Sequence, residues 1–365
     1  MKDKTFDMKT AVVILNWNTK DYLRRFLPGL IASCEGADAE VVVADSASTD
    51  GSMEMMAEEF PAVHRIVLDA NYGFTGGYNR ALKQVEADLL VLINSDVEVT
   101  PDWLGPLTRW MDAHPDCGAC APKLLSWYDH GCFEYAGAAG GLIDRWGYTF
   151  CRGRVLKRVE RDEGQYDVPA DVLWATGACL MVRSSVWRHF GGLDDRFFAH
   201  MEEIDLCWRM QLEGWKVQVV PESVVYHLGG GTLPSNSPWK LQLNFRNNLL
   251  LLENNLARTY VSEGIPPARA LRKANRRIGI RMMLDGGSAL VYLVSGKWDY
   301  FKAVYKAHEE YRNLRRPVTV ERLEAFRDRF GDKARVAGIW KGDLLVQALL
   351  RKDGIFAYLR RKNGS

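Results

Sequence analysis

The chain has 365 residues, of which 47% are hydrophobic, 26% charged and 11% aromatic. These proportions are typical of a globular protein and exclude a disordered chain, a collagen-like repeat and a disulfide scaffold. The length suggests about two domains, or one large domain with an appendage. The formal net charge is only +2, but residues 258–365 contain 24 basic and 11 acidic side chains, so residues 1–257 are net negative. This asymmetry predicts a basic appendage that meets an anionic partner.

The cysteines and the apolar segments indicate the cellular compartment of the chain and whether it spans a membrane. Seven cysteines at irregular spacing do not form a disulfide framework. Cys117 and Cys120 lack a second pair at zinc spacing, so we expect them to be buried apolar residues. There is no recognisable signal peptide, and the longest apolar candidate, 278–294, is interrupted by Arg281, Asp285 and two glycines. We therefore expect a cytoplasmic chain that does not span a membrane.

The first hundred residues alternate short β-branched runs with helical patterns. Continuous apolar strands separated by helices predict a parallel sheet covered on both faces. In such α/β sheets, ligands bind beyond the carboxyl ends of the strands, so the polar residues at those ends are the candidates for function. Strands are expected at 10–15, 40–45, 65–68 and 88–94, and helices at 20–33, 52–59 and 75–84.

The second half has a mixed and then a helical pattern. A Gly-rich loop region precedes a strand at 178–182, a helix at 203–213, and short strands at 217–220 and 223–226. After Pro234 the pattern is helical, and from about Arg258 it is also basic. We therefore expect an α/β domain over 1–257 and a basic helical region over 258–365.

Two polar segments follow the second and third expected strands. The carboxylate of Asp45 can accept hydrogen bonds from a nucleobase or a ribose hydroxyl, although loop capping is the alternative. The loop 71–79 opens a helix and contains three glycines that permit a close backbone approach to a phosphate. Its Gly-x-x-Gly-Gly order is not the dinucleotide fingerprint, so alone it is a weak signal.

Carboxylates gather at two further places. Asn94, Asp96 and Glu98 follow the fourth strand, where closely spaced oxygen ligands suit Mg²⁺ or Mn²⁺ bridged to a diphosphate, with turn formation as the alternative. The segment 202–205 holds three carboxylates in four residues, which repel one another unless metal, substrate or protonation compensates. These acids also suit a helix N-terminus electrostatically. His227 follows a strand-like run, where an imidazole can be structural or can complete a metal site.

Six motifs occur in a specific order along the chain: VVILNWN (12–18), DSASTDGS (45–52), NYGFTGGYN (71–79), NSD (94–96), FFAHMEEIDLCWR (197–209) and YH (226–227). This order resembles the family 2 inverting glycosyltransferases of the GT-A fold, especially the bacterial rhamnosyltransferase-like branch that builds surface polysaccharides. The resemblance covers residues 10–257, and the tail matches only in general character. It implies an α/β fold with a mostly parallel central sheet flanked by helices and a C-terminal helical extension.

The resemblance implies a role for each motif. Asp45 would contact the nucleotide base, and the 71–79 loop would flank the nucleoside and diphosphate. Asp96 stands where the last aspartate of the Asp-x-Asp metal motif stands, with Asn94 in the first place, and His227 would join Asp96 in holding Mg²⁺ or Mn²⁺. The nucleotide-sugar site would comprise Asn16, Asp45, Asn71, Gly73, Gly76, Gly77, Asn79, Asn94 and Asp96.

Glu203 occupies the general-base position, where relatives normally have aspartate. Because glutamate is one methylene longer, Asp205 or Glu202 is expected to share the catalytic work. Trp174 lies in the segment where relatives receive the acceptor, and it either stacks on a sugar face or belongs to the core. The implied reaction is inverting transfer from a UDP- or dTDP-sugar to a saccharide or lipid-linked saccharide acceptor.

The basic tail has two interpretations. Amphipathic basic helices at 268–281, 301–316 and 344–361 favour a peripheral contact with an anionic membrane surface, on the inner face of the plasma membrane. Alternatively, their apolar stripes pack on the catalytic core. A nucleic-acid partner is not expected, because no recognition module is present.

Two other function classes remain as alternatives. A sugar nucleotidyltransferase would need a Gly-rich basic triphosphate loop near the N-terminus, and residues 16–20 do not form one. A degenerate saccharide-binding or scaffold protein would not need the acidic residues and histidine that the chain keeps.

Overall fold

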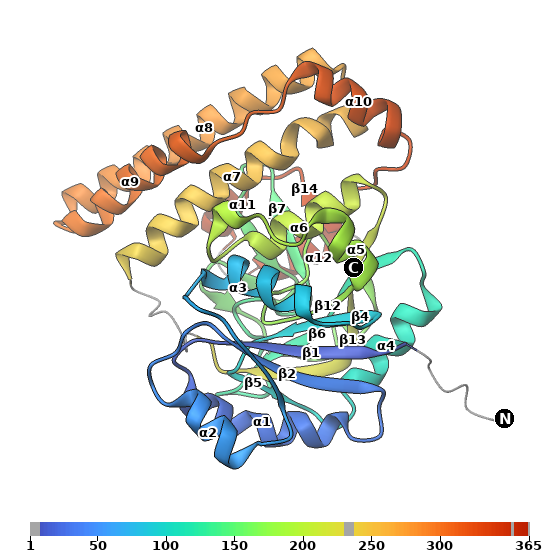
Figure 1. The fold of residues 1–365 in the computed structure, drawn as a ribbon. Coiled ribbons are helices and arrows are strands. Elements are labelled where there is room, and N and C mark those ends of the chain that lie inside the picture. The colour runs from blue at the N-terminus through green and yellow to red at the C-terminus, as the bar shows by residue number, and fades with distance from the viewer. Residues whose placement is uncertain (1–7, 230–236, 352–353, 364–365) are drawn as a thin grey trace.

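The computed structural model describes residues 8–229, 237–351 and 354–363, and shows a curled α/β sheet with helices on both faces (Figure 1). The first four principal strands are parallel and lie in the order β4-β1-β2-β3. Asn16 pairs with Asp45 and Ile14 with Ile93, so the carboxyl ends of β1, β2 and β4 meet at one edge. The strands are β1 (Thr10–Asn16), β2 (Ala39–Asp45), β3 (His64–Val67) and β4 (Leu89–Ile93).

The rest of this sheet is mixed in direction. β12 (Cys179–Arg183) runs antiparallel between β4 and β6 (Cys117–Ser126), while β13 (Lys216–His227) is parallel to β6. β5 (Val97–Val99) and β11 (Ala170–Asp171) pair antiparallel with β13. The two strands expected at 217–220 and 223–226 are therefore one strand, with a register shift between Val220 and Val224.

Alternating side chains of these strands build two cores on opposite faces of the sheet. Val13 and Leu90 belong to one buried cluster, and their neighbours Val12 and Leu89 belong to the other. This is the pattern expected for strands covered on both sides. The helices of this half are α1 (Lys20–Cys34), α2 (Ser52–Glu59), α3 (Gly73–Ala81), α4 (Leu104–Ala113), α5 (Ser184–Phe190) and α6 (Glu202–Leu212), with short 3-10 turns at Leu82–Gln84 and Asp195–Phe197.

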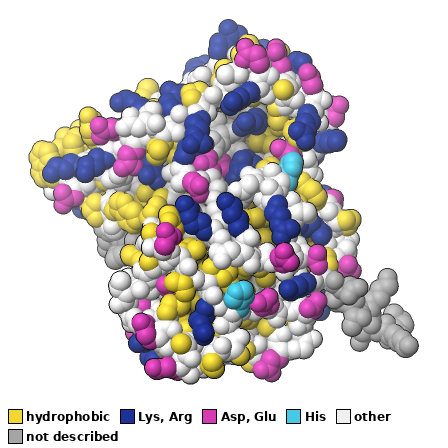
Figure 2. Space-filling view, viewed as in Figure 1, with side chains coloured by type: hydrophobic (Ala, Val, Ile, Leu, Met, Phe, Trp, Pro, Cys, Tyr) yellow, Lys and Arg dark blue, Asp and Glu magenta, His cyan; other side chains and the backbone are white. Residues whose placement is uncertain are grey.

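Long helices cover one end of the molecule, at the top of Figure 1 and in the matching view of Figure 2. They are α7 (Pro238–Ser262), α8 (Pro267–Val294), α9 (Trp298–Leu314) and α10 (Val320–Phe330). The expected boundary at residue 258 falls inside α7, whose Leu249 to Leu252 are buried in the same cluster as the sheet. No helix of the described ranges is long and apolar enough to cross a membrane.

A second, smaller sheet brings the C-terminal segment back to the α/β body. Its order is β10-β9-β8-β7-β14, and β14 pairs in parallel with β7. Leu344 and Leu359 are buried against Leu142 and Phe150 of this sheet. The elements are β7 (Gly141–Asp144), β8 (Thr149–Cys151), β9 (Arg154–Val155), β10 (Arg158–Val159), β14 (Ile339–Trp340), α11 (Leu344–Leu350) and α12 (Ile355–Asn363).

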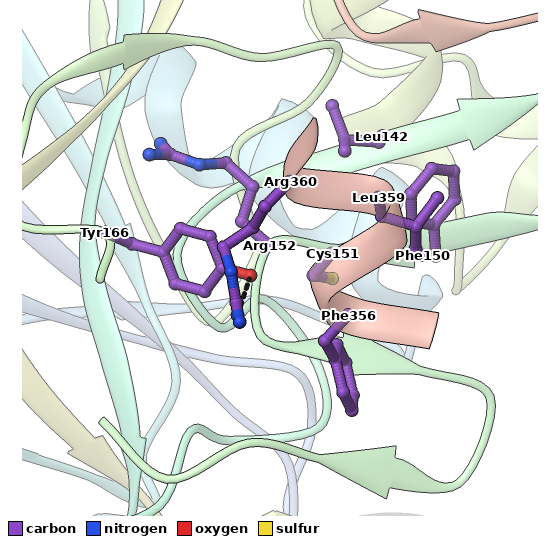
Figure 3. A pocket seen from close by; sticks show the side chains of 8 residues that line it. All are labelled: Leu142, Phe150, Cys151, Arg152, Tyr166, Phe356, Leu359 and Arg360. Carbon is purple, nitrogen blue, oxygen red and sulfur yellow. Dashed lines mark hydrogen bonds between the residues drawn. The ribbon is translucent and has the colours of Figure 1, made fainter. Parts of the chain in front are cut away.

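A small cavity lies where α12 meets this sheet, between Phe150, Arg152, Tyr166 and Arg360 (Figure 3). Its volume of about 10 Å³ fits one water molecule. A sugar or a nucleotide cannot enter this cavity, whereas the polar residues predicted from the sequence lie at the carboxyl edge of the main sheet.

Candidate active site

The ends of β1 and β2 form a hydrogen-bonded unit. Asn16 Nδ2 donates to Asp45 Oδ1 at 2.7 Å, and the Ser48 backbone N–H donates to Asp45 Oδ2 at 2.9 Å. Thr19 Oγ1 donates to Asn16 Oδ1 at 2.5 Å and fixes the amide orientation. Each carboxylate oxygen can accept a second hydrogen bond. Asp45 is thus held rigidly at the edge of the sheet with accepting capacity left for a ligand.

The 71–79 loop is held by contacts with the protein itself. Gly73 has φ +68°, and a Cβ there would lie 2.6 Å from the Phe198 carbonyl oxygen. A Cβ on Gly77 would lie 2.7 Å from Leu15, and one on Gly76 would lie 2.8 Å from Tyr72 Cβ. These glycines let α3 approach β1 and the chain before α6, which gives them a packing function whether or not a ligand binds.

The two asparagines of this loop are also engaged. Asn71 Oδ1 accepts from the Gly73 N–H at 2.8 Å. Asn79 bonds both the N–H and the carbonyl of Leu193, and donates to Asp195. The side chain of Asn79 therefore joins α3 to the loop before α6.

A buried histidine lies between two buried carboxylates. His227 Nε2 is 3.2 Å from Asp96 Oδ1, and His227 Nδ1 is 3.4 Å from Glu134 Oε1. Burial alone would lower the pKa of His227, but Asp96 and Glu134 outweigh it and raise this pKa to about 10. The sequence predicts the pairing of Asp96 with His227 but gives no sign of Glu134, which stands alone in a Gly-rich loop region.

The turn that leads into α6 has a strained backbone. Phe198, His200 and Met201 all have positive φ, between 63° and 72°, a region that costs non-glycine residues energy. From α7, Asn247 Nδ2 lies 2.7–3.0 Å from the carbonyl oxygens of Phe197, Ala199 and His200. The Thr75 N–H of α3 donates to the Phe198 carbonyl at 3.1 Å. Two helices, α3 and α7, thus fix the direction in which α6 begins.

The first two residues of α6 are carboxylates in unusual surroundings. Among the described residues, Glu202 Oε2 and Glu203 Oε2 are buried without a hydrogen-bond partner. Burial raises the pKa of Glu203 to about 7, while backbone N–H groups, including that of Gly177, oppose the rise. Burial and the Glu203 charge raise the pKa of Glu202 well above its usual range. Both carboxyl groups therefore hold a proton more tightly than an exposed glutamate does, and Glu203 can gain or lose its proton near neutral pH.

Asp205 is placed differently from its two neighbours. It is fully buried, and its oxygens accept from Arg209 Nε at 2.6 Å, Asn254 Nδ2 at 2.8 Å and Asn255 Nδ2 at 2.9 Å. This carboxylate ties α6 to α7. The sequence suggests that Asp205 shares the base function, but the structure gives it a bridging position between helices.

A short segment before β12 connects the two acidic groups. A Cβ on Gly177 would lie 3.7 Å from Glu203 Cδ, so the Glu203 carboxyl lies against this glycine. The carbonyl of the next residue, Ala178, accepts from the Asn94 N–H at 3.0 Å. The residue before Gly177, Thr176, donates its hydroxyl to the carbonyl of Ala136. The backbone N–H of Ala136 in turn donates to the carboxylate of Glu134. Glu203 therefore borders the same few residues as the Asp96–His227–Glu134 group.

Trp174 lies in the core rather than on a surface. It is 3% exposed, its indole N–H donates to the Leu142 carbonyl at 3.1 Å, and its ring lies against Gly141. Of the two alternatives that the sequence left open for Trp174, the structure therefore favours the core position, because its ring and its indole N–H both contact the protein.

The fit of a divalent cation rests on Asp96 and His227. Within the described ranges, no three His, Cys, Asp or Glu side chains converge as a ready-made metal site. Mg²⁺ and Mn²⁺ need only one or two protein ligands when a diphosphate supplies further oxygens. Asp96 and His227 offer one carboxylate and one imidazole in contact at Nε2, while Glu134 lies on the Nδ1 side. Because the pKa of His227 is raised, its ring must release a proton when it binds a metal. This pair fits a cation that arrives with the donor.

Comparison with known proteins agrees with this arrangement. Residues 11–125 match the family model for glycosyl transferase family 2. An N-acetylglucosaminyl-diphospho-decaprenol L-rhamnosyltransferase of Mycobacterium tuberculosis is 29% identical over 232 residues, 59% of this chain and 75% of that protein.

Two solved structures share the fold. GalNAc-T7 with UDP, GalNAc and Mn²⁺ superposes with a TM-score of 0.51 and 16% identity, over 67% of this chain and 48% of that chain. The Pyrobaculum calidifontis mannosyltransferase PcManGT with GDP-Man and Mn²⁺ has a TM-score of 0.50 and 14% identity, over 84% and 87%. Residues 11–125 thus form a glycosyl transferase family 2 domain, and the chain resembles the rhamnosyltransferases of this family and has the GT-A fold.

Proposed function

We propose that this glycosyltransferase moves a sugar from a nucleoside diphospho-sugar to a hydroxyl of a saccharide acceptor, with inversion at the anomeric carbon. The observation that supports this best is Glu203, a buried carboxyl with a pKa of about 7 and an oxygen unbonded among the described residues. A general base works best when its pKa is near the operating pH. A single base is enough for a direct displacement, because no covalent intermediate has to form.

On the donor side, the carboxyl edge of the sheet binds the nucleotide. Asp45, held by Asn16, accepts from the base or ribose, and Asn94 and Asp96 face the diphosphate. Asp96 and His227 would hold a Mg²⁺ or Mn²⁺ ion, which would supply positive charge against the leaving diphosphate. The 71–79 loop and α3 cover the nucleoside from the side next to the α6 turn.

On the acceptor side, Glu203 removes the proton of the attacking hydroxyl. Burial and the charge of Glu203 raise the pKa of Glu202 well above its usual range, which favours the neutral form of Glu202 and so limits the repulsion that Glu203 feels when ionised. Asp205 acts as a positioning residue, because its bonds to Arg209 and α7 fix the helix that presents Glu203.

We further propose a lipid-linked saccharide as acceptor and a UDP- or dTDP-sugar as donor. The support is the mycobacterial relative, which by its name acts on a diphospho-decaprenol-linked sugar. All seven cysteines are free thiols, which is consistent with work in a reducing compartment such as the cytoplasm.

The test separates binding from chemistry. Thermal shift with UDP-, GDP- and dTDP-sugars, with and without Mn²⁺, identifies the donor. We expect Glu203→Gln to bind that donor as the wild type does and to lower kcat by at least about 100-fold, because the general base is lost. The control is Glu222→Gln, which changes an exposed glutamate of β13. Full turnover by Glu203→Gln would contradict the assigned base, and an absence of binding to any nucleotide-sugar would contradict the function.

A further inference from the structure

The outer face of α8 exposes large apolar side chains. Met283, Leu290, Val291 and Val294 are 72%, 58%, 63% and 80% exposed. With 3.6 residues per turn, they lie within about a third of the helix circumference. Trp298, 59% exposed, follows at the start of α9. Large side chains exposed together in this way mark an interaction surface.

The same face of α8 is cationic in its first half. Four exposed basic residues lie on the same side of the helix as Met283 and Val294. They are Arg269, Arg272, Lys273 and Arg276. The one acidic residue of α8 is Asp285, which is fully buried and bonded to Arg281 Nε at 2.8 Å. The outward face of this helix therefore offers positive charge followed by apolar surface and no negative charge.

The opposite face of α8 is the one that packs on the core, so the exposed apolar side chains are not the core-facing side of this helix. Ala270, Ala274 and Ile278 are buried in the main cluster. The other amphipathic stretches of the C-terminal region are also covered: Val304 and Tyr311 of α9 are 2% exposed, and Leu344 and Leu359 pack on the small sheet. Only part of the basic tail thus packs on the core, and the outer face of α8 remains uncovered by the described residues.

The picture of the surface agrees with this division. The α8–α9 pair projects beyond the body at the left of Figure 1, and in the same view Figure 2 shows yellow side chains gathered at that end, with dark blue ones beside them. The projecting end includes the turn between α8 and α9, where Lys297 and Trp298 are both exposed.

We propose that the outer face of α8, with Trp298, docks on an anionic lipid bilayer. A bilayer surface places phosphate charge next to hydrocarbon, so it satisfies both halves of the face at once. A second copy of the chain would cover the apolar half, but α8 has no exposed acid with which to meet the cations of the other copy. The inference goes beyond the proposed function, because binding to a bilayer requires neither donor nor acceptor.

The experiment measures co-sedimentation of the full chain with vesicles, without substrates. We expect binding to vesicles of phosphatidylethanolamine and phosphatidylglycerol in equal parts, weak binding to phosphatidylcholine alone, and a decrease with added salt. Replacing Arg272 and Arg276 together by Gln should weaken binding by about 25-fold, roughly fivefold per charge removed. Leu290→Glu and Val294→Glu should each weaken it by about tenfold or more.

Two matched controls change similar exposed residues elsewhere. Arg188→Gln alters an exposed cation of α5, and Leu349→Glu alters a 74% exposed leucine of α11. Both should bind vesicles as the wild type does. The proposal is overturned if the wild type does not bind anionic vesicles, if the α8 variants bind as well as the controls, or if sedimentation velocity shows a dimer that Leu290→Glu dissociates without any change in vesicle binding.

Discussion

Glu203 makes the folded protein less stable whenever it is ionised. Its pKa in the folded state is about 7, against 4.5 as the ordinary value. The unfolded chain therefore loses this proton at a lower pH than the folded chain. The contribution of Glu203 to the free energy of unfolding is fully present below about pH 4.5. It decreases by about 3 kcal/mol as the pH rises from there through 7.

This linkage predicts that Glu203→Gln stabilises the protein while it abolishes turnover. The variant should be more stable than the wild type by about 2 kcal/mol at pH 8, and the difference should disappear near pH 5. Urea unfolding at the two pH values measures it. A wild type that is the more stable protein at pH 8 would contradict the raised pKa. Turnover of the wild type should rise with pH through about 7.

Glu134 is the residue of the site that the sequence does not reveal. It lies 3.4 Å from His227 Nδ1, and its second oxygen accepts from the Ala136 N–H. A carboxylate on the far nitrogen of a metal-binding histidine fixes the ring orientation. Glu134→Gln should therefore weaken Mn²⁺ binding by about 10- to 100-fold, as Asp96→Asn should.

Calorimetric titration of Mn²⁺ in the presence of the donor nucleotide measures this effect without turnover. Glu222→Gln again serves as the control and should bind Mn²⁺ normally. If the wild type and Asp96→Asn bind Mn²⁺ with equal affinity, the metal does not bind at Asp96 and His227. If only Glu134→Gln binds Mn²⁺ normally, the metal site stands but Glu134 does not orient His227.

At the scale of elements, the site depends on how α7 holds the turn before α6. Asn247 donates to three carbonyl groups of a turn in which three residues have positive φ. Asn247→Ala should destabilise the protein by about 2–3 kcal/mol because buried carbonyls lose their donor. It should also lower kcat by tenfold or more, since Glu203 follows the turn directly.

The neighbouring residue of α7 provides the control. Asn248 is equally buried and bonds the Gly147 carbonyl and Arg281, and it touches the turn only through a long 3.9 Å contact with the Met201 sulfur. Asn248→Ala should cost similar stability and leave kcat within about twofold at temperatures where both variants are folded. If the two variants lose kcat equally, the contacts of Asn247 with the turn do not position Glu203.

The sequence predicts elements well where apolar runs end in polar residues. β1, β2 and β4 with Asn16, Asp45 and Asn94 follow from that pattern, and the structure brings their ends to one edge. The direction of β12 cannot be predicted, because a buried strand has the same apolar pattern in either direction. Nor can the sequence show that Asp205 faces α7 rather than Glu203, since helical spacing says which residues share a face but not what that face meets.

At the scale of the whole molecule, charge and helical pattern predict a basic tail but not where it is attached. The expected boundary at 257 falls within α7, whose middle and last turns, from Leu249 to Val261, are buried in the same cluster as the sheet. The last strand and the last two helices then return to the small sheet. The C-terminal region therefore shares its core with the catalytic region at both of its ends.

A shared core predicts one cooperative unfolding transition for the full chain. Leu344 begins α11 and is fully buried, so Leu344→Asp should lower the stability of the whole protein by about 4 kcal/mol or more. Leu349 lies on the same helix and is 74% exposed, so Leu349→Asp should have almost no effect. Calorimetry and tryptophan fluorescence should report the same midpoint for each variant, and that midpoint should move only for Leu344→Asp. A separate early transition in Leu344→Asp, with the nucleotide-binding region still melting at the temperature of the wild type, would show instead that the two regions fold independently.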